Sequence, residues 1–175
     1  MIRLRNLQKK DAEFMLEWMH DKELQKCFRK KMADVTPEEA MAFCTADNTE
    51  EQIRDGANLH YAIVNEQDEY LGTISLKNID LVNKNAEYAI SMRRCAHGTG
   101  AAAEATGLLL KKGFNRLGLH RIYLNVLKDN TRAIRFYEKC GFTYEGEFRD
   151  CIQIDGEYKN LKWYSILKTD FDNLM

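Results

Sequence analysis

The first third of the chain has the hydrophobic pattern of helices. Ile2 and Leu4 alternate with polar residues and predict a short strand, and the apolar residues between Asp11 and His20 predict a helix after it. A second helix is predicted to begin at Thr36, because its side chain can accept from free N–H groups and Pro37 suits the first helical position. We therefore expect a mostly helical N-terminal third.

The middle of the chain changes to the pattern of strands. Residues 59–64, 70–79 and 86–92 are short apolar runs rich in Ile, Tyr, Val and Thr, with polar turns between them. We predict three antiparallel strands here. A helix should follow and end near Gly118, with one face formed by a periodic stripe of Ala103, Gly107, Leu110, Phe114 and Leu117.

The last part of the chain predicts a buried strand, a helix and a hairpin. The strand is 121–127, and the helix starts at Asn130, a good N-cap, and ends at Gly141. Asp155-Gly156 is the residue pair that a two-residue hairpin turn of type I′ requires. With no repeat, no flexible linker and a single proline, residues 1–175 are expected to form one α/β (α+β) domain with a mostly antiparallel sheet.

Composition narrows the functional classes. The chain of 175 residues is 45% hydrophobic and 30% charged, and its formal net charge of -1 gives no electrostatic footprint for nucleic acid. No apolar run approaches the roughly 18 residues of a membrane span, so we expect neither a nucleic acid nor a membrane partner.

The histidines show no metal-ligand spacing, and we expect no metal. A cytoplasmic location is expected from five cysteines that are odd in number and far apart: Cys27, Cys44, Cys95, Cys140 and Cys151.

A glycine-rich stretch, HGTGAAAEA from His97 to Ala105, separates the third middle strand from the helix after it. Gly98-x-Gly100-x-x-Ala103 matches a dinucleotide-binding pattern, but the first acid after the next strand is Asp129, about 30 residues on instead of about 20. A Walker loop is excluded because no Lys-Ser/Thr follows. Small residues entering a helix suit a pyrophosphate, and they equally suit a turn that only lets strand and helix pack closely.

A second motif lies downstream. Asn130 and Tyr137 are seven residues apart, two helical turns along one face, ahead of Gly141-Phe142. Together with the glycine loop, this motif resembles the GNAT family of acetyl-CoA-dependent N-acetyltransferases, whose loop reads Gln/Arg-x-x-Gly-x-Gly/Ala. His97 stands here where Gln or Arg is usual. The resemblance covers nearly the whole chain and is strongest to the RimJ/RimL-type and spermidine-acetyltransferase-like branch, whose C-terminal pattern is echoed by YEGEFRDCIQIDGEYKN.

The resemblance implies a GNAT-like fold with about seven strands and about four helices, and transfer of an acetyl group from acetyl-CoA to a primary amine without an acyl-enzyme. It also implies that strand 86–92 splays from strand 121–127 to admit the pantetheine arm, near the amides of Ser91 and Met92. Arg93 or Arg94 would pair with the phosphates. The cofactor-binding residues it implies are Met92, Arg94, His97, Gly98, Thr99, Gly100, Ala101, Ala102, Asn130 and Tyr137.

Two residues match the catalytic positions of the family. Tyr137 would protonate the leaving thiolate, because a phenol has a pKa of about 10, and its alternative is a core tyrosine. Glu87 would be the base, although a carboxylate can strip an ammonium only through a water relay or with a raised pKa, and its alternative is a solvent-facing strand residue. Glu104 is a weaker candidate. An acyl-cysteine on Cys140 or Cys95 has no supporting histidine motif.

The acceptor is the least determined part of the function. A polyamine, an amino sugar nucleotide and a protein N-terminal amine all fit an amine acetyltransferase, and a near-neutral chain does not choose between them. The alternative is a non-catalytic acyl-CoA-binding sensor module that keeps the fold. Edge strands in the C-terminal hairpin would also make a homodimer unsurprising.

Overall fold

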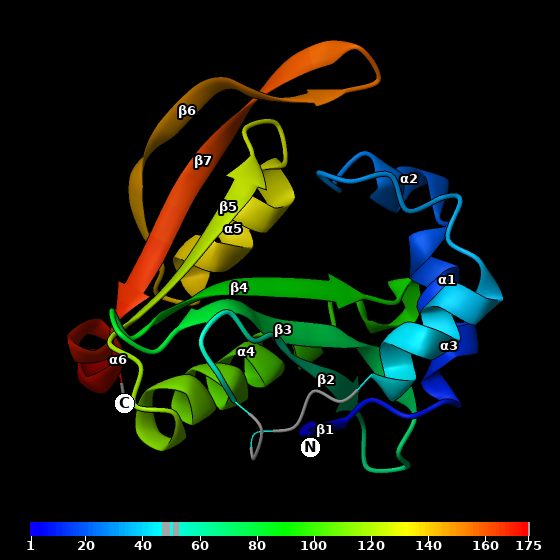
Figure 1. The fold of residues 1–175 in the computed structure, drawn as a ribbon, viewed down its shortest axis with the longest axis horizontal. Coiled ribbons are helices and arrows are strands. Elements are labelled where there is room, and N and C mark those ends of the chain that lie inside the picture. Colours follow the sequence, from blue (N-terminus) through cyan, green and yellow to red (C-terminus); the bar gives the residue numbers. More distant parts are fainter. Residues whose placement is uncertain (47–49, 51–52, 175) are drawn as a thin grey trace.

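A seven-stranded sheet forms the centre of the molecule (Figure 1). The computed structural model describes residues 1–46, 50 and 53–174. The strand order is β1-β2-β3-β4-β5-β7-β6, and all neighbouring pairs are antiparallel except β4 with β5, which is parallel. The strands are β1 (Arg3–Asn6), β2 (Leu59–Val64), β3 (Tyr70–Asp80), β4 (Asn85–Met92), β5 (Arg121–Leu127), β6 (Thr143–Ile154) and β7 (Glu157–Leu167).

Helices cover both faces of this sheet and divide the interior into two cores. Along β2, Tyr61 and Ile63 point into the larger core, and Ala62 and Val64 point into the smaller one, as the alternation of a strand requires. The smaller core lies under α1 and α3, and the larger one under α4, α5 and α6. The helices are α1 (Asp11–Met19), α2 (Lys22–Gln25), α3 (Pro37–Thr45), α4 (Ala101–Lys111), α5 (Thr131–Lys139) and α6 (Lys168–Leu174).

Local sequence signals account for most of the element boundaries. Thr36 caps α3 in a full capping box with Glu39, and Pro37 occupies the first turn. Asp155 and Gly156 both have positive φ, 49° and 83°, as the predicted type I′ turn requires. The predicted fold class, with its three antiparallel middle strands and C-terminal hairpin, is therefore confirmed.

The helices differ from the sequence prediction in number and in one buried face. The short α2 and the C-terminal α6 were not predicted, since each is too short and too polar to show a periodic stripe. Ala103 and Gly107 are exposed, so the predicted stripe of α4 is wrong at its start. The buried face instead carries Ala101, Ala105 and Leu109, and the wider π-helical turn Lys112–Arg116 then brings Phe114 to the core.

Gly72 is expected to be essential to the contact between β3 and β4. A Cβ built there would lie 2.3 Å from the backbone oxygen of Ser91, so Gly72→Ala must push the strands apart and should lower the free energy of unfolding by about 1–3 kcal/mol. Gly107→Ala is the matched control, because it adds the same methyl group to an exposed helical position with nothing within 4 Å and should stabilise by about 0.5–1 kcal/mol. Urea unfolding of both variants measures the difference, and equal effects would contradict the steric account.

Candidate active site

The sheet opens between β4 and β5. Their parallel pairing runs only from Asn85 opposite Arg121 to Glu87 opposite Tyr123. Beyond this point β4 stays paired with β3, and β5 with β7, so the two strands diverge while each remains anchored on its other side (Figure 1). The splay that the family resemblance implies is therefore confirmed. The opening exposes unpaired strand backbone, which an extended ligand can enter and hydrogen-bond.

The glycine loop lies at the end of β4 and leads directly into α4. Gly98 and Gly100 have φ values of +77° and +85°, which favour glycine, and a Cβ at either position would meet nothing within 4 Å. Thr99 braces the loop by donating to the Ala96 carbonyl at 2.9 Å. Within the described part of the chain, no acceptor takes the N–H groups of Gly98, Thr99, Gly100 or Ala102. These free amides at a helix N-terminus fit the pyrophosphate of acetyl-CoA.

The two arginines before the loop are engaged by acids of the N-terminal region and of the turn between β2 and β3. Arg93 donates to Glu17 at 2.7 Å and to Glu69 at 3.2 Å. Arg94 donates to Asp21 at 2.7 and 2.8 Å, and its hydrogen bonds are the main cause that lowers the pKa of Asp21 to about 2. Both side chains therefore fasten the loop to the N-terminal region, and neither guanidinium is left free for a ligand phosphate.

Sequence reasoning missed a cation close to the loop. The pKa of His97 is lowered mainly by burial and secondly by the positive charge of Arg132, in the first turn of α5. Arg132 therefore lies near the loop. Asn130 accepts from the Ala133 N–H at 3.2 Å, so its predicted N-cap role is confirmed. Met92 ends β4 and is buried beside the loop. The loop and the start of α5 thus face each other across the opening.

Tyr137 projects from α5 into the larger core beside the opening. Its ring packs edge-on against Tyr88, with centroids 5.9 Å apart, and against Phe142 at 6.0 Å. Burial raises the pKa of Tyr137 to about 12. A phenol with this pKa is protonated at neutral pH. Its hydroxyl forms no hydrogen bond with any described residue, so the proton is free to be donated. Burial also raises the pKa of Cys140, which disfavours a thiolate nucleophile there.

Glu87 lies where the pairing of β4 with β5 ends. It is only 7% exposed, so the interpretation as a solvent-facing strand residue is wrong. Its carboxylate accepts from Arg29 at 2.8 Å, Lys77 at 3.1 Å and Asn78 at 3.0 Å. Burial raises the pKa of Glu87, but Lys77 and Arg29 outweigh it, and the net pKa lies below the ordinary value. The carboxylate is therefore ionised at neutral pH, and the raised pKa that direct base catalysis would favour does not occur.

Arg29 is a second residue of the site that the sequence did not signal. It comes from the segment between α2 and α3, and it donates both to Glu87 on β4 and to Asn125 on β5. Its guanidinium therefore spans the two strands beside their opening. Glu104, the weaker candidate base, instead accepts from the Ile2 N–H at 2.9 Å and fastens β1 to α4.

The described residues, which omit 47–49, 51–52 and 175, contain no cluster of three or more metal-binding side chains. No described helix has the length and apolar character needed to cross a membrane.

A sheet opened between two parallel strands, with a free-amide loop at the opening, is the framework of an acyl-CoA-dependent transferase. A family model described as acetyltransferase (GNAT) domain matches residues 2–143. The spermidine N(1)-acetyltransferase of Vibrio cholerae is 31% identical over 121 residues, which cover 69% of this chain and 70% of that protein. The N-acetyltransferase p20 of Bacillus licheniformis is 30% identical over 96% of this chain and 93% of its own length.

Solved structures agree with the sequence comparisons. The crystal structure of the spermidine N-acetyltransferase from Vibrio cholerae, in complex with CoA and spermine, superposes with a TM-score of 0.84 at 26% identity over 98% of both chains. The chain belongs to the GNAT family of acetyltransferases. It is an acetyl-CoA-dependent N-acetyltransferase, which transfers an acetyl group to an amine, and the relatives do not favour a non-catalytic sensor module.

Lys77→Gln is expected to raise the pKa of Glu87. Burial then acts against the ionised carboxylate with only Arg29 left as a cationic partner. The titration of the Glu87 side-chain carboxyl carbon by NMR measures this shift. Lys10→Gln is the control, since it removes a partner of Asp68 instead and should leave the titration of Glu87 unchanged. A pKa of Glu87 that stays the same in Lys77→Gln would contradict the assigned electrostatics.

Proposed function

We propose that Tyr137 and Glu87 carry out the proton transfers of the acetyl transfer. The observation that carries this proposal is their chemistry at one opening of the sheet: a free, protonated phenol and a buried, ionised carboxylate. Tyr137 donates its proton to the departing thiolate, because a pKa of about 12 keeps the proton on the phenol at neutral pH until the thiolate forms beside it. Glu87 orients the acceptor amine and takes its proton through a water, because the lowered pKa of Glu87 makes direct abstraction from an ammonium unfavourable.

Acetyl-CoA supplies the acetyl thioester when bound. The residues proposed to hold it follow the opening from the glycine loop to α5. The free amides of Gly98, Thr99, Gly100 and Ala102 take the pyrophosphate, and the backbone near Met92 meets the pantetheine arm and polarises the thioester carbonyl. His97, Thr99 and Ala101 complete the loop. Asn130 contacts the arm from the start of α5, and Arg132 balances the phosphate charge. The sequence also predicts Arg94 here, but its pairing with Asp21 would have to open first.

The acceptor is a primary amine. A polyamine has the support of the relatives' names, because the Vibrio cholerae and Escherichia coli relatives are spermidine N(1)-acetyltransferases. An amino sugar nucleotide and a protein N-terminal amine are the other classes. We further propose that the chain acts as one domain and in the cytoplasm, and five cysteines without a disulfide among the described residues support a reducing compartment.

Thiol release from acetyl-CoA, with each acceptor class offered in turn, tests the activity, and Tyr137→Phe tests the acid. The variant should lower kcat by about 100-fold or more, because general acid catalysis contributes about 10²–10⁴-fold. Its dissociation constant for acetyl-CoA should change little, since the phenyl ring keeps its packing. Tyr144→Phe, at an exposed position of β6, is the control and should keep full activity. Equal kcat in wild type and Tyr137→Phe would remove Tyr137 from the acid role.

Gly100→Val is expected to weaken acetyl-CoA binding by about tenfold or more while the protein still folds. The left-handed backbone at φ +85° disfavours a β-branched residue, so the loop must shift and lose at least one charge-assisted hydrogen bond to phosphate. Gly118→Val is the matched control, because it imposes the same strain at φ +66° away from the loop. Calorimetric titration of both variants should give weaker acetyl-CoA binding in the first alone, and equal affinities would contradict the pyrophosphate assignment.

A further inference from the structure

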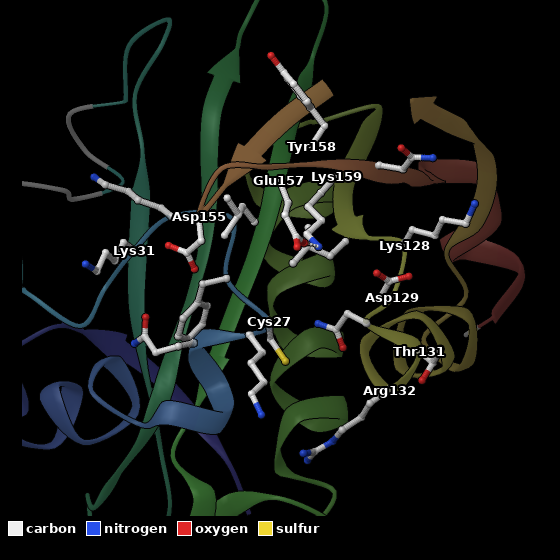
Figure 2. A pocket seen from close by; sticks show the side chains of 18 of the residues that line it. Cys27, Lys31, Lys128, Asp129, Thr131, Arg132, Asp155, Glu157, Tyr158 and Lys159 are labelled. Atoms are coloured by element: carbon white, nitrogen blue, oxygen red, sulfur yellow. Dashed lines mark hydrogen bonds and ion pairs between the residues drawn. The ribbon is translucent and has the colours of Figure 1, made fainter. Parts of the chain in front are cut away.

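A cleft of about 950 Å³ adjoins the opening of the sheet (Figure 2). One wall is the segment between α2 and α3, at residues 25–33. The second is the turn from β5 into α5, at 127–132, and the third is the tip of the β6–β7 hairpin, at 154–160. Asn130, proposed above to contact the pantetheine arm, lies on the second wall. The cleft is therefore where an acceptor can reach the proposed acetyl group.

The walls of this cleft carry more cations than acids. The acids are Asp129, Asp155 and Glu157. Since the whole chain has a net charge of -1, the cationic excess is local to the cleft. Such an excess attracts an anion and repels a polycation. The lining cations, six in number, are Lys26, Lys30, Lys31, Lys128, Arg132 and Lys159.

Ion pairs neutralise some of these cations but not all of them. Lys159 pairs with Glu157 inside the cleft, whereas Lys128 pairs with Glu147 and Lys26 with Glu23, two acids that do not line it. Lys30 forms no ion pair with the described residues, which leave out 47–49, 51–52 and 175. An uncompensated ammonium on the wall of a cleft is available to a ligand phosphate or carboxylate.

The cations divide between two ligands. Arg132 lies near enough to His97 to lower the pKa of that imidazole, and it is the cation proposed above for acetyl-CoA. Lys31 lies on the opposite side of the cleft from Arg132 (Figure 2). Among the described residues, Lys31 pairs only with the exposed Asp34, at 3.2 Å, and such surface pairs are weak. Lys30 and Lys31 are thus left for the anionic part of a second ligand.

An aromatic shelf, formed by Tyr123, Trp163 and Phe148, lies on the same side of the sheet as Glu87. Tyr123, in register with Glu87, stacks on Trp163 with centroids 5.8 Å apart and planes 22° from parallel. Phe148 extends the shelf, 5.0 Å from Trp163. Trp163 is in register with Asn125, the partner of Arg29, so the shelf lies on the Glu87 side of the sheet. Trp163 lies between Tyr123 and Phe148, and Arg121 lies over the Tyr123 ring, so the accessible part of the shelf is its ring edges and the exposed Phe148. Such an aromatic surface can pack against a sugar ring, but it also attracts ammonium groups, so it is the cleft lysines that disfavour a polyamine.

We infer that the acceptor is an amino sugar carrying a phosphate or diphosphate, with its amine at Glu87, its ring along the Tyr123–Trp163 shelf and its phosphate at Lys30 and Lys31. The inference rests on the proposed function. It assigns these two lysines to acceptor selection, and it separates this chain from an enzyme for free polyamines.

Matched acceptors test the role of the phosphate. Thiol release is measured with glucosamine, glucosamine 6-phosphate, UDP-glucosamine and spermidine. The expected result is a kcat/KM at least tenfold higher for one or both phosphorylated sugars than for glucosamine or spermidine. Preference for glucosamine 6-phosphate points to a monophosphate, and preference for UDP-glucosamine points to a nucleotide-linked sugar.

Charge reversal tests the two lysines. Lys30→Glu/Lys31→Glu should lower kcat/KM for the preferred phosphorylated sugar at least tenfold, change that for glucosamine less than twofold, and leave the affinity for acetyl-CoA unchanged. Lys111→Glu/Lys139→Glu is the control, because it makes the same change in net charge at exposed helix ends outside the cleft. A loss of acetyl-CoA affinity in the first variant would overturn the assignment, since the lysines would then serve the cofactor.

The remaining outcomes separate this inference from the proposed function. Equal rates for glucosamine and its phosphorylated forms, or the highest rate with spermidine, would overturn the acceptor class and leave the acetyl transfer intact. If no amine releases thiol, the proposed function fails, and calorimetric titration of UDP-glucosamine decides the inference alone. Binding that is lost in Lys30→Glu/Lys31→Glu would support the phosphate site, and absence of binding to the wild type would overturn it.

Discussion

The early end of the β4–β5 pairing is the constraint on which the rest of the site depends. Only three residue pairs join these strands, and the last of them contains Glu87. The opening persists because each strand is held from its other side: β4 by β3 as far as Gly72 opposite Met92, and β5 by β7 as far as Leu127. A ligand arm can therefore enter the sheet without breaking a strand pair. The glycine loop lies at one end of this opening because it continues β4.

Charge compensation links the opening to the N-terminal segments. A buried carboxylate is costly unless it is paired and hydrogen-bonded, and Glu87 has both kinds of partner. Lys77 comes from the neighbouring strand, but Arg29 comes from the segment between α2 and α3. The same ion pair that keeps Glu87 ionised thus holds a wall of the cleft against the sheet. Chemistry at Glu87 and the shape of the cleft are coupled through one guanidinium.

A second set of contacts ties the glycine loop to the same region. Arg94 bonds Asp21, and Asp21 also caps α2 by accepting from the backbone of Glu23 and Leu24. Arg93 makes the corresponding link to α1 through Glu17. Asp21 therefore holds both the loop, through Arg94, and the start of α2, which leads into the cleft wall. Both arginines beside the glycine loop are occupied by carboxylates for this reason.

The sequence by itself determined what depends on neighbouring residues. The capping box at Thr36, the Asp155-Gly156 turn, the Asn130 cap and the alternation along the strands all act within a few residues, so they predicted most elements and the fold class. The glycine loop and the Asn130–Tyr137 motif pointed to the candidate site through their resemblance to the family. Only the tertiary structure decided the partners of Glu87, the engagement of Arg93 and Arg94, and the cationic cleft. These depend on contacts between segments far apart in the chain, such as Arg29 with Glu87 across 58 residues, and no local pattern encodes which distant charges will meet.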